Sequence, residues 1–358
     1  MFKPLVIKDL VAQVPIIQGG MGIGISLHRL AGTVAKEGGI GLLSTAQIGY
    51  QRDDFEKSPL RSNWEAAKEQ FEKAKEIAQG GIVGFNIMVA QFNYDKIVRR
   101  CAEIGADVIV SGAGLPVNLP ELVEGTKTKI APIVSSAKGA KVLLKTWAKR
   151  YNRTADFVVI EGPKAGGHLG FKPEDIETMM IQENMDKEVT EIVKIVKQYA
   201  DQYDENVPVV FAGGVFDKGD IQHYLDLGCS GVQMATRFVV TEECDAPEDF
   251  KKRYLNAEEK DIRILKSPVG MPGRAINNTF LETSKVEQIP IETCRDCLAL
   301  KHCDRTTIPY CISEALLNSV RGNTENGLLF CGANVFRVKA KTTVKSLIDE
   351  LTGRLEPV

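Results

Sequence analysis

The sequence predicts an α/β fold of the (β/α)8 or TIM-barrel class, followed by a helical C-terminal extension that contains cysteines. Three observations carry this prediction. Eight short apolar runs alternate with amphipathic segments of helical length, glycine-rich stretches follow several of these runs, and the chain has 358 residues. A barrel of this class needs roughly 250 residues, so this length allows one barrel and a sizeable addition.

The apolar runs are interpreted as parallel strands buried on both faces, because such strands are continuously hydrophobic. They occupy residues 15–17, 40–43, 82–86, 108–110, 130–134, 157–160, 208–211 and 231–234. Helices are predicted between them over residues 27–37, 64–78, 94–104, 117–124, 138–151, 188–203 and 218–227. Eight strands can close a barrel, whereas six or seven would form the alternative fold, an open doubly wound sheet.

The alternation stops near residue 240, which divides the predicted chain into two parts. We expect the barrel over residues 1–240 and the extension over 241–358, packed on the barrel because no linker separates them. Within the extension, helices are predicted over 246–255, 312–320 and 342–351. The stretch 267–278 is rich in glycine and proline and is predicted to be a loop.

Charge and hydropathy exclude several classes of partner. The formal net charge is -2, so nucleic acid is not expected to bind, and no apolar run is long enough to cross a membrane. Charged residues interrupt the first fifteen positions where a signal peptide would be apolar, which predicts a cytoplasmic protein. We expect a small-molecule substrate, and a homodimer is left open.

The active site of a barrel lies in the loops after the strands, and the unusual residues of this sequence fall there. Glycine-rich stretches at 18–24, 161–170 and 212–214 follow predicted strands. Gly213, Gly214 and Thr236 are candidates for binding a phosphate, because the loops after strands 7 and 8 commonly do so. The alternative is that these glycines only form tight turns. No glycine continues Gly22-x-Gly24 as a dinucleotide-binding fingerprint requires, so no Rossmann NAD site is predicted.

His168 is the candidate catalytic residue. The chain has 4 histidines, and His168 is the one in a glycine-rich loop at the end of a predicted strand. An imidazole can donate or accept a proton near neutral pH. The alternative is a loop histidine that only hydrogen-bonds to the backbone.

Several motifs together resemble the superfamily of nitronate monooxygenases and type II enoyl-ACP reductases. They include IIQGGMG, GFNIMVA, VSGAGLP, EGPKAGGHLG, FAGGVFDKGD, GVQMATRFVVTEEC, SPVGMPGRAI and ENGLLFCGANVFRV, and they span nearly the whole chain except the cysteine segment. The resemblance implies a barrel that binds FMN without a covalent bond. The implied flavin contacts are Met21, Gly22, Asn86, Glu161, Gly166, Gly167, Gly213, Gly214, Met234, Ala235 and Thr236. Ala235 departs from the glycine of most relatives.

The resemblance implies an FMN-dependent oxidoreductase with His168 in a catalytic role. In the favoured alternative the enzyme oxidises alkyl nitronates with oxygen, and His168 orients the nitro group or deprotonates a neutral nitroalkane. In the second it reduces enoyl thioesters or quinones and uses NAD(P)H. The alternative of another class is a flavin-binding protein without catalytic activity.

A cysteine segment over residues 294–311 departs from the family pattern. Cys294, Cys297, Cys303 and Cys311 could supply four thiolates to one metal ion, as in structural zinc sites. Zn²⁺ and an iron–sulfur cluster are both left open, and so is a set of free thiols. His302 or Cys331 could replace one ligand.

Overall fold

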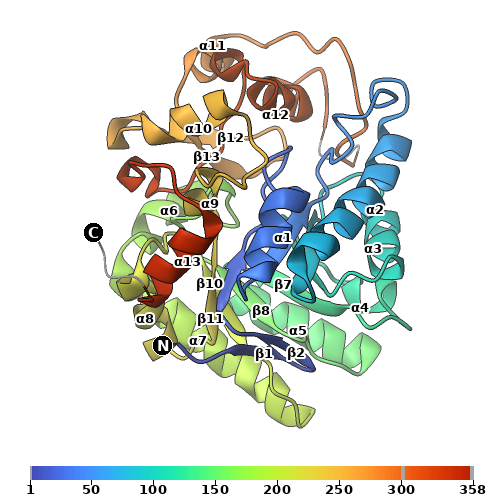
Figure 1. Ribbon diagram of the computed structural model, residues 1–358, viewed down its shortest axis with the longest axis vertical. Helices are drawn as coiled ribbons and strands as arrows, with labels where there is room; N and C mark the ends of the chain where they lie inside the picture. Colours follow the sequence, from blue (N-terminus) through green and yellow to red (C-terminus); the bar gives the residue numbers. More distant parts are fainter. Residues whose placement is uncertain (1, 300–302, 355–358) are drawn as a thin grey trace.

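The computed structural model describes residues 2–299 and 303–354, and its centre is a closed barrel of eight parallel strands (Figure 1). The strands follow one another around the barrel in chain order, and β11 pairs with β3 to close it. All eight predicted strands are confirmed. They are β3 (Ile16–Gln18), β4 (Ile40–Ser44), β5 (Ile82–Met88), β6 (Val108–Gly112), β7 (Lys129–Val134), β8 (Val158–Glu161), β10 (Val209–Ala212) and β11 (Gly231–Met234).

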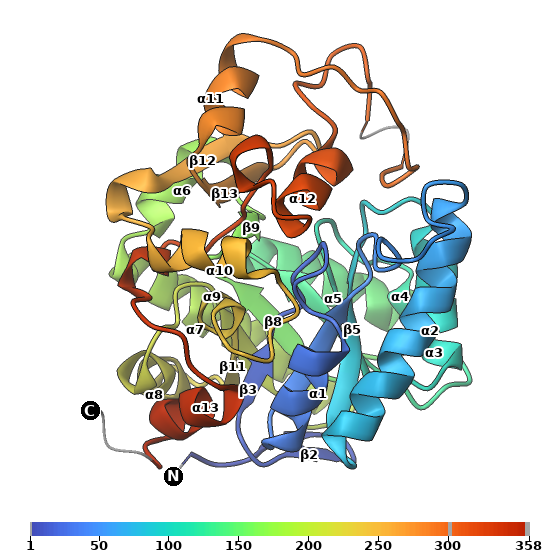
Figure 2. The ribbon, with the colours of Figure 1, turned by 45° about the horizontal axis from the view of Figure 1, so that its top comes forward.

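Both faces of these strands are apolar because each face packs against a different layer. Val108 and Val110 belong to a cluster inside the barrel, whereas Ile109 between them packs toward the surrounding helices. A hairpin of β1 (Leu5–Ile7) and β2 (Leu10–Ala12) adds Leu5 and Ile7 to the interior cluster. The hairpin lies at the end of the barrel opposite to α11 (Thr279–Val286) and α12 (Ile312–Val320) of the C-terminal extension (Figure 2). This end is therefore closed, and the other end is left for a site.

The helices that surround the barrel lie where the sequence predicts them, with three differences in length. They are α1 (His28–Lys36), α2 (Pro59–Ala78), α3 (Tyr94–Glu103), α4 (Leu119–Leu122), α5 (Ala137–Tyr151), α7 (Gln182–Gln202) and α8 (Lys218–Asp226). Helix α4 is only one turn long, and α2 and α7 begin five and six residues before their predicted starts. The early turn of α7 is polar apart from Met185, so apolar periodicity does not reveal it.

Capping explains several helix starts. The Ser136 hydroxyl accepts a hydrogen bond from the backbone N–H of Gly139 at the start of α5. Asp217 and Asp220 form a reciprocal capping box at the start of α8. Such caps satisfy N–H groups that have no partner within the helix. A helix missing from the prediction, α6 (Pro173–Met179), follows a two-residue strand β9 (Gly167–His168) in the long connection after β8.

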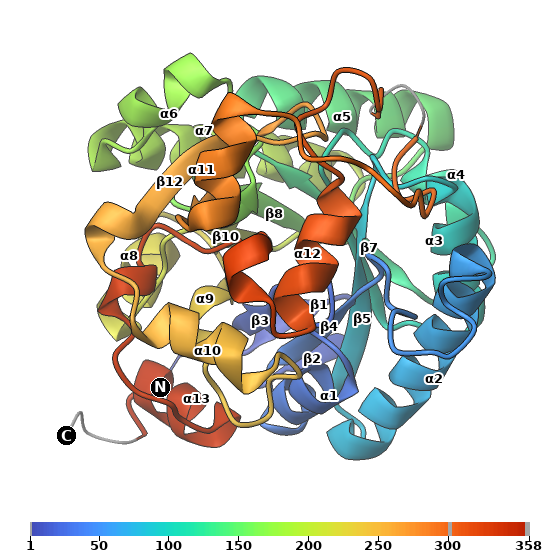
Figure 3. The same ribbon diagram turned by 90° about the horizontal axis from the view of Figure 1, so that it is seen from above.

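The part of the extension up to α12 covers the carboxyl ends of the strands (Figure 3), whereas α13 (Val344–Thr352) packs beside α1 and α8 in the ring of helices. The extension contains α9 (Thr236–Val239), α10 (Glu248–Leu255), β12 (Ile262–Lys266), β13 (Pro272–Ile276), α11 (Thr279–Val286), α12 (Ile312–Val320) and α13 (Val344–Thr352), with single 3₁₀ turns over Glu259–Asp261, Thr324–Asn326 and Val335–Arg337. The three helices predicted here are α10, α12 and α13. None of the described helices is long and apolar enough to cross a membrane.

The prediction of a loop over residues 267–278 is wrong for its second half. Pro272–Ile276 forms β13, which pairs antiparallel with β12 and with β9. Pro272 and Gly273 weaken the strand signal in the sequence, and the pairing with β9 is not local. This small sheet matters for the site because β9 contains His168.

Candidate active site

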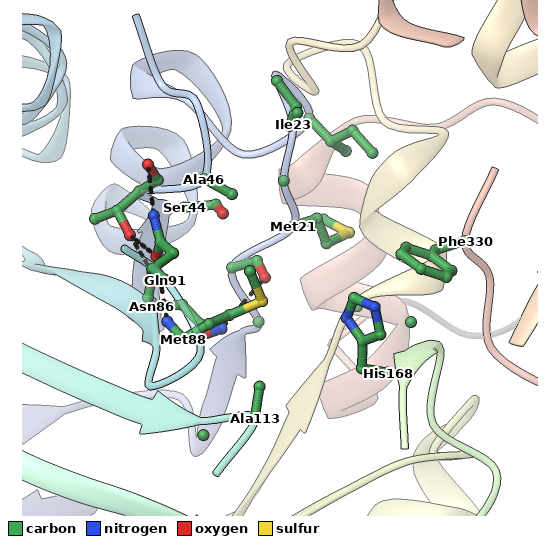
Figure 4. Close-up of a pocket in the computed structure, with 18 of the residues that line it drawn as sticks. Met21, Ile23, Ser44, Ala46, Asn86, Met88, Gln91, Ala113, His168 and Phe330 are labelled. Carbon is green, nitrogen blue, oxygen red and sulfur yellow. Dashed lines mark hydrogen bonds between the residues drawn. The ribbon is translucent and has the colours of Figure 1, made fainter. Parts of the chain in front are cut away.

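A cavity of about 420 Å³ opens at the carboxyl end of the barrel, beneath the extension. Its walls are the loops that follow β3, β4, β5, β8, β10 and β11, and α12 and residues 296–298 cover it. Side chains from distant parts of the chain face each other across it. In Figure 4, His168 and Phe330 lie on one side, Asn86 and Met88 lie on the other, and Met21 lies between them.

The first wall is the loop after β3, which a buried polar network holds in shape. The Gln18 side chain donates to the Ser26 hydroxyl at 2.9 Å, and the backbone N–H of Met21 donates to the same hydroxyl at 2.9 Å. On the facing strand, the Asn86 amide donates to the carbonyl of Gly20 at 3.4 Å. A Cβ on Gly20 would lie 2.4 Å from the Asn86 Cβ, so this close approach needs glycine. The backbone is thereby exposed to the cavity.

The opposite wall is a glycine cradle formed after β10, with further residues from the extension. Gly213 and Gly214 have φ angles of +101° and +93°, in the region that favours glycine. The Asn334 amide donates to the Gly214 carbonyl at 2.6 Å, and the Gly332 N–H donates to the Thr236 hydroxyl at 3.1 Å. Lys164 lies beside Gly214 and also lines the cavity. Such a cradle, with a cation next to it, suits an anion such as phosphate.

His168 is held by the small sheet of the extension. Its strand β9 pairs with β13, and its Nε2 lies 2.7 Å from the hydroxyl of Ser267. The Phe330 ring packs edge-on against the imidazole at a centroid distance of 4.9 Å. Enclosure in this apolar setting disfavours the charged form and lowers the pKa of His168 to about 4. The imidazole is therefore neutral at pH 7.

Glu161 ends β8 and lies at the floor of the cavity. Desolvation raises the pKa of its carboxyl group to about 7, although the Gly170 N–H and the charge of Arg274 act in the opposite direction. Gly170 donates to Glu161 Oε1 at 3.1 Å. The Arg274 guanidinium itself donates to the backbone carbonyls of Pro163 and Ala165, at 2.7 and 2.5 Å, and so fixes the loop that precedes His168.

All twelve predicted flavin-contact and catalytic residues line this one cavity. Their individual roles stay predictions. Sequence reasoning missed the residues that the extension and the strand ends add, namely Lys164, Gln233, Ser267, Phe330, Gly332 and Asn334. Gln233 had a detectable signal, since a polar residue interrupts the apolar run of β11. The residues after 329 lie in ENGLLFCGANVFRV, a motif of the resemblance, but only the tertiary fold shows that they reach the site.

The cavity fits a flat heteroaromatic cofactor with a phosphate tail. The Oε1 atom of Gln233 is buried and has no hydrogen-bond partner among the described residues, so an N–H group of a ligand would satisfy it. The Gly213–Gly214 cradle with Lys164 lies on the same side and would accept the phosphate. The unsatisfied amide oxygen and the cradle together fit FMN, whose ring carries an N–H group and whose tail ends in a phosphate.

The predicted metal ligands lie in the segment between α11 and α12, which covers the cavity and is called the cover below. All four cysteines of the segment are free thiols, and Cys297 lines the cavity itself. Within residues 2–299 and 303–354, no three His, Cys, Asp or Glu side chains converge in a geometry that holds a metal ion. His302, the proposed alternative ligand, lies outside the described residues. Cys331 lies apart from the segment, behind Gly166.

Comparisons with known proteins give the family. The family model for nitronate monooxygenase matches residues 3–353. A "Probable nitronate monooxygenase" of Bacillus subtilis is 24% identical over 364 residues, which cover 94% of each chain. A Rhodococcus jostii protein, named as the dehydrogenase of a hydroxy-methyl-oxo-octahydroindene-carboxyl-CoA, is 26% identical over 95% of this chain and 92% of its own.

Solved structures agree on the fold. The structure of FabK from Thermotoga maritima superimposes with a TM-score of 0.70 at 21% identity, and covers 96% of this chain and 93% of the other. The fold and the site thus define an oxidoreductase built on a (β/α)8 barrel. The chain belongs to the nitronate monooxygenase family.

Proposed function

We propose that this protein is an FMN-dependent oxidoreductase that oxidises alkyl nitronates with oxygen. The observation that carries the proposal is the position of His168, which faces the centre of a cavity whose walls supply a phosphate cradle and an unsatisfied amide oxygen. When bound, FMN would accept electrons from the substrate and pass them to oxygen. The protein supplies binding, orientation and proton handling.

The proposed flavin site uses residues from both walls. Gly213, Gly214 and Thr236 would hold the phosphate, with Lys164 as its counter-charge. Gln233 and Asn86 would bind the polar edge of the ring system, and Met21 would pack against the ring. The Ala235 side chain leaves its backbone N–H available to the phosphate. The cysteine segment is proposed in its own right as a metal site, because that function does not depend on the flavin.

His168 would act as a neutral imidazole. Its Nε2 is engaged with Ser267, which leaves Nδ1 for the substrate. If Nε2 carries the proton and donates to Ser267, Nδ1 can take a proton from the carbon next to a neutral nitro group. If Ser267 donates to Nε2, Nδ1 carries the proton and can donate to a nitro oxygen of a nitronate. Either tautomer meets the substrate as an uncharged side chain, and the imidazole becomes charged only where it takes up the proton of the neutral nitroalkane.

The test is the oxidation of a nitronate by the purified protein. We expect the flavin released from the denatured protein to be FMN. The protein should consume oxygen with an alkyl nitronate in the absence of nicotinamide. Removal of the flavin should abolish nitronate turnover together with its pH dependence. A protein that carries FMN but consumes no oxygen with any alkyl nitronate would contradict the proposed reaction while leaving the flavin site standing.

A second candidate is an NAD(P)H-dependent reductase of enoyl thioesters. One observation favours it: the cavity continues between α2 and α3, past Leu60, Ala67, Ile97 and Ile104, and is longer than a small nitronate needs. The Rhodococcus relative is named for a CoA thioester substrate. Under this candidate, NADH or NADPH would bleach the flavin and an enoyl thioester would restore its colour. A quinone is the other oxidant to compare.

A further inference from the structure

The side chain that contacts His168 from the extension is a serine in a tight connection between two strands. Ser267 directly follows β12, and its loop over residues 267–271 leads into β13. The Ser267 N–H donates to the carbonyl of Met271 at 3.1 Å, and the Gly270 N–H donates to the carbonyl of Ser267 at 2.9 Å. Strand β13 in turn pairs with β9, the strand that contains His168. The Ser267 hydroxyl therefore has a fixed place relative to the imidazole.

The Ser267 hydroxyl is buried, so its hydrogen needs an acceptor within the protein. Ser267 is 2% exposed and is not among the residues that line the cavity. In the part of the chain that the structure describes, the hydroxyl has two partners, the Val269 N–H at 3.3 Å and the Nε2 atom of His168 at 2.7 Å. A backbone N–H can only donate, which leaves Nε2 as the acceptor of the hydroxyl hydrogen. A proton on Nε2 would leave this buried hydrogen without a partner, which costs free energy.

The imidazole ring cannot satisfy this hydroxyl in the opposite orientation. Half a turn of the ring about its bond to Cβ would place a carbon atom against Ser267. The Phe330 ring packs edge-on against the imidazole, and the Phe330 carbonyl accepts a hydrogen bond from the Tyr254 hydroxyl, so this neighbour is itself held in place. In Figure 4 the nitrogen of His168 on the side away from Phe330 faces the cavity. The ring thus presents Nδ1 to a bound substrate.

We propose that Ser267 is a positioning residue, which holds His168 in the tautomer with its proton on Nδ1 and so makes the histidine a hydrogen-bond donor toward the substrate. With a proton on Nδ1, a neutral imidazole has no lone pair there, so it does not remove a proton from the reacting carbon. It donates instead to an oxygen atom attached next to that carbon. This role toward a nitro group rests on the proposed function, whereas the tautomer itself does not.

A donor at this position fits a nitronate better than a neutral nitroalkane. The negative charge of a nitronate lies largely on its oxygens, and charged oxygens accept stronger hydrogen bonds than neutral ones. With a neutral nitroalkane, the same bond would stabilise the charge that develops on the nitro oxygens while water takes the proton from the carbon. Burial lowers the pKa of His168 to about 4, so the donor itself stays neutral. His168 therefore selects substrates that carry an acceptor oxygen next to the reacting carbon.

The tautomer can be measured directly by ¹⁵N NMR of the full-length protein labelled at histidine. In a neutral imidazole, the protonated and the unprotonated nitrogen have well-separated chemical shifts, and His168→Ala identifies the signals of this residue among those of the 4 histidines. We expect a protonated Nδ1 and an unprotonated Nε2 at about pH 7. A protonated Nε2 or a charged ring would overturn the proposal. The measurement needs no nitronate, so a failure of the proposed reaction would leave it intact.

Substitutions at Ser267 test the positioning role. Ser267→Ala removes the donor, so His168 should become a mixture of tautomers, and kcat/KM with an alkyl nitronate should fall about 3- to 10-fold, the effect of one hydrogen bond. Ser267→Thr keeps the hydroxyl and should restore both. Ser319→Ala is the matched control, because it removes another buried hydroxyl of the extension, which donates to the Leu328 carbonyl at 2.8 Å, and should change neither. FMN content and far-UV circular dichroism check the folding of each variant. An unchanged tautomer in folded Ser267→Ala would overturn the positioning role.

Discussion

At the scale of single residues, His168 is the side chain on which the proposed chemistry depends. The substitution His168→Ala removes the imidazole and leaves the glycine cradle intact, so FMN should stay bound. We expect kcat with a neutral nitroalkane to fall by about 10²- to 10⁴-fold, which is the usual contribution of a positioned acid or base. His223→Ala is the matched control, because His223 pairs with Asp186 on the outer helices. Full turnover of His168→Ala would exclude this histidine from catalysis.

Glu161 and His168 shift stability with pH in opposite directions. The pKa of Glu161 is raised to about 7 from 4.5, so the folded state holds a proton that the unfolded state has lost, and stability falls as pH rises from 4.5 to 7. The pKa of His168 is lowered to about 4 from 6.5, so its contribution is lost as pH falls from 6.5 to 4.

The variant Glu161→Gln isolates the first of these effects. Its side chain cannot ionise, so its thermal stability should gain on the wild type as pH rises from 5 to 8. The measurement is the melting temperature of flavin-free protein at several pH values. Parallel curves for the two proteins would show that Glu161 titrates at its ordinary pKa.

The sequence revealed site residues in the loops that follow the barrel strands, and missed those that only tertiary contacts bring to the cavity. His168 could be found because its loop follows a strand and is rich in glycine. Ser267 could not, since it lies 99 residues further along the chain and reaches His168 through the pairing of β9 with β13. Phe330, Gly332 and Asn334 belong to ENGLLFCGANVFRV, one of the motifs of the resemblance, but nothing in this motif shows that its residues reach the cavity.

At the scale of elements, the loop after β10 should be the least tolerant of added side chains. A Cβ on Gly213 would lie 2.7 Å from the Gly162 carbonyl oxygen, and its φ of +101° is strained for other residues. We expect Gly213→Ala to abolish FMN binding, measured by flavin fluorescence. Gly80→Ala is the control, because Gly80 has a similar φ of +95° and open space around it. Its cost of about 1 kcal/mol should leave the flavin bound.

The cover of the cavity should depend on one buried cation. Arg295 is 6% exposed and pairs with Glu56 and Glu314, so Arg295→Met would leave Glu314 without its partner and Glu56 with Arg321 alone. We expect KM to rise several-fold and proteolysis within residues 287–311 to become faster. Lys285→Met removes an exposed pair with Glu282 and should change neither, since surface pairs contribute little. Equal effects of the two substitutions would show that Arg295 does not anchor the cover.

Regular elements were predictable where one periodicity dominates. The barrel strands are continuously apolar because both faces are buried, and this pattern located all eight of them. Strand β13 was missed because Pro272 and Gly273 are unfavourable in strands and its partner β9 is only two residues long. Tertiary pairing overrides local propensity at such positions.

At the scale of the whole molecule, the barrel and the extension form one functional unit. Leu317 of α12 and Leu347 of α13 belong to the same apolar cluster as Ile16 and Phe85 of the barrel strands. The site needs both parts, because the barrel supplies His168 and the extension supplies its partners Ser267 and Phe330. The division at residue 240 therefore stays a description of chain organisation, and we do not expect the barrel to act alone.

The proposed reaction requires a nitronate to deliver electrons to FMN bound in this cavity. The most direct test mixes the purified protein anaerobically with an alkyl nitronate, NADH or NADPH, each alone, and follows the absorbance of oxidised flavin. We expect rapid bleaching by the nitronate, much slower bleaching in His168→Ala, and little bleaching by either nicotinamide. Rapid bleaching by NADH or NADPH, with none by the nitronate, would contradict the proposed reaction and identify the protein as a reductase.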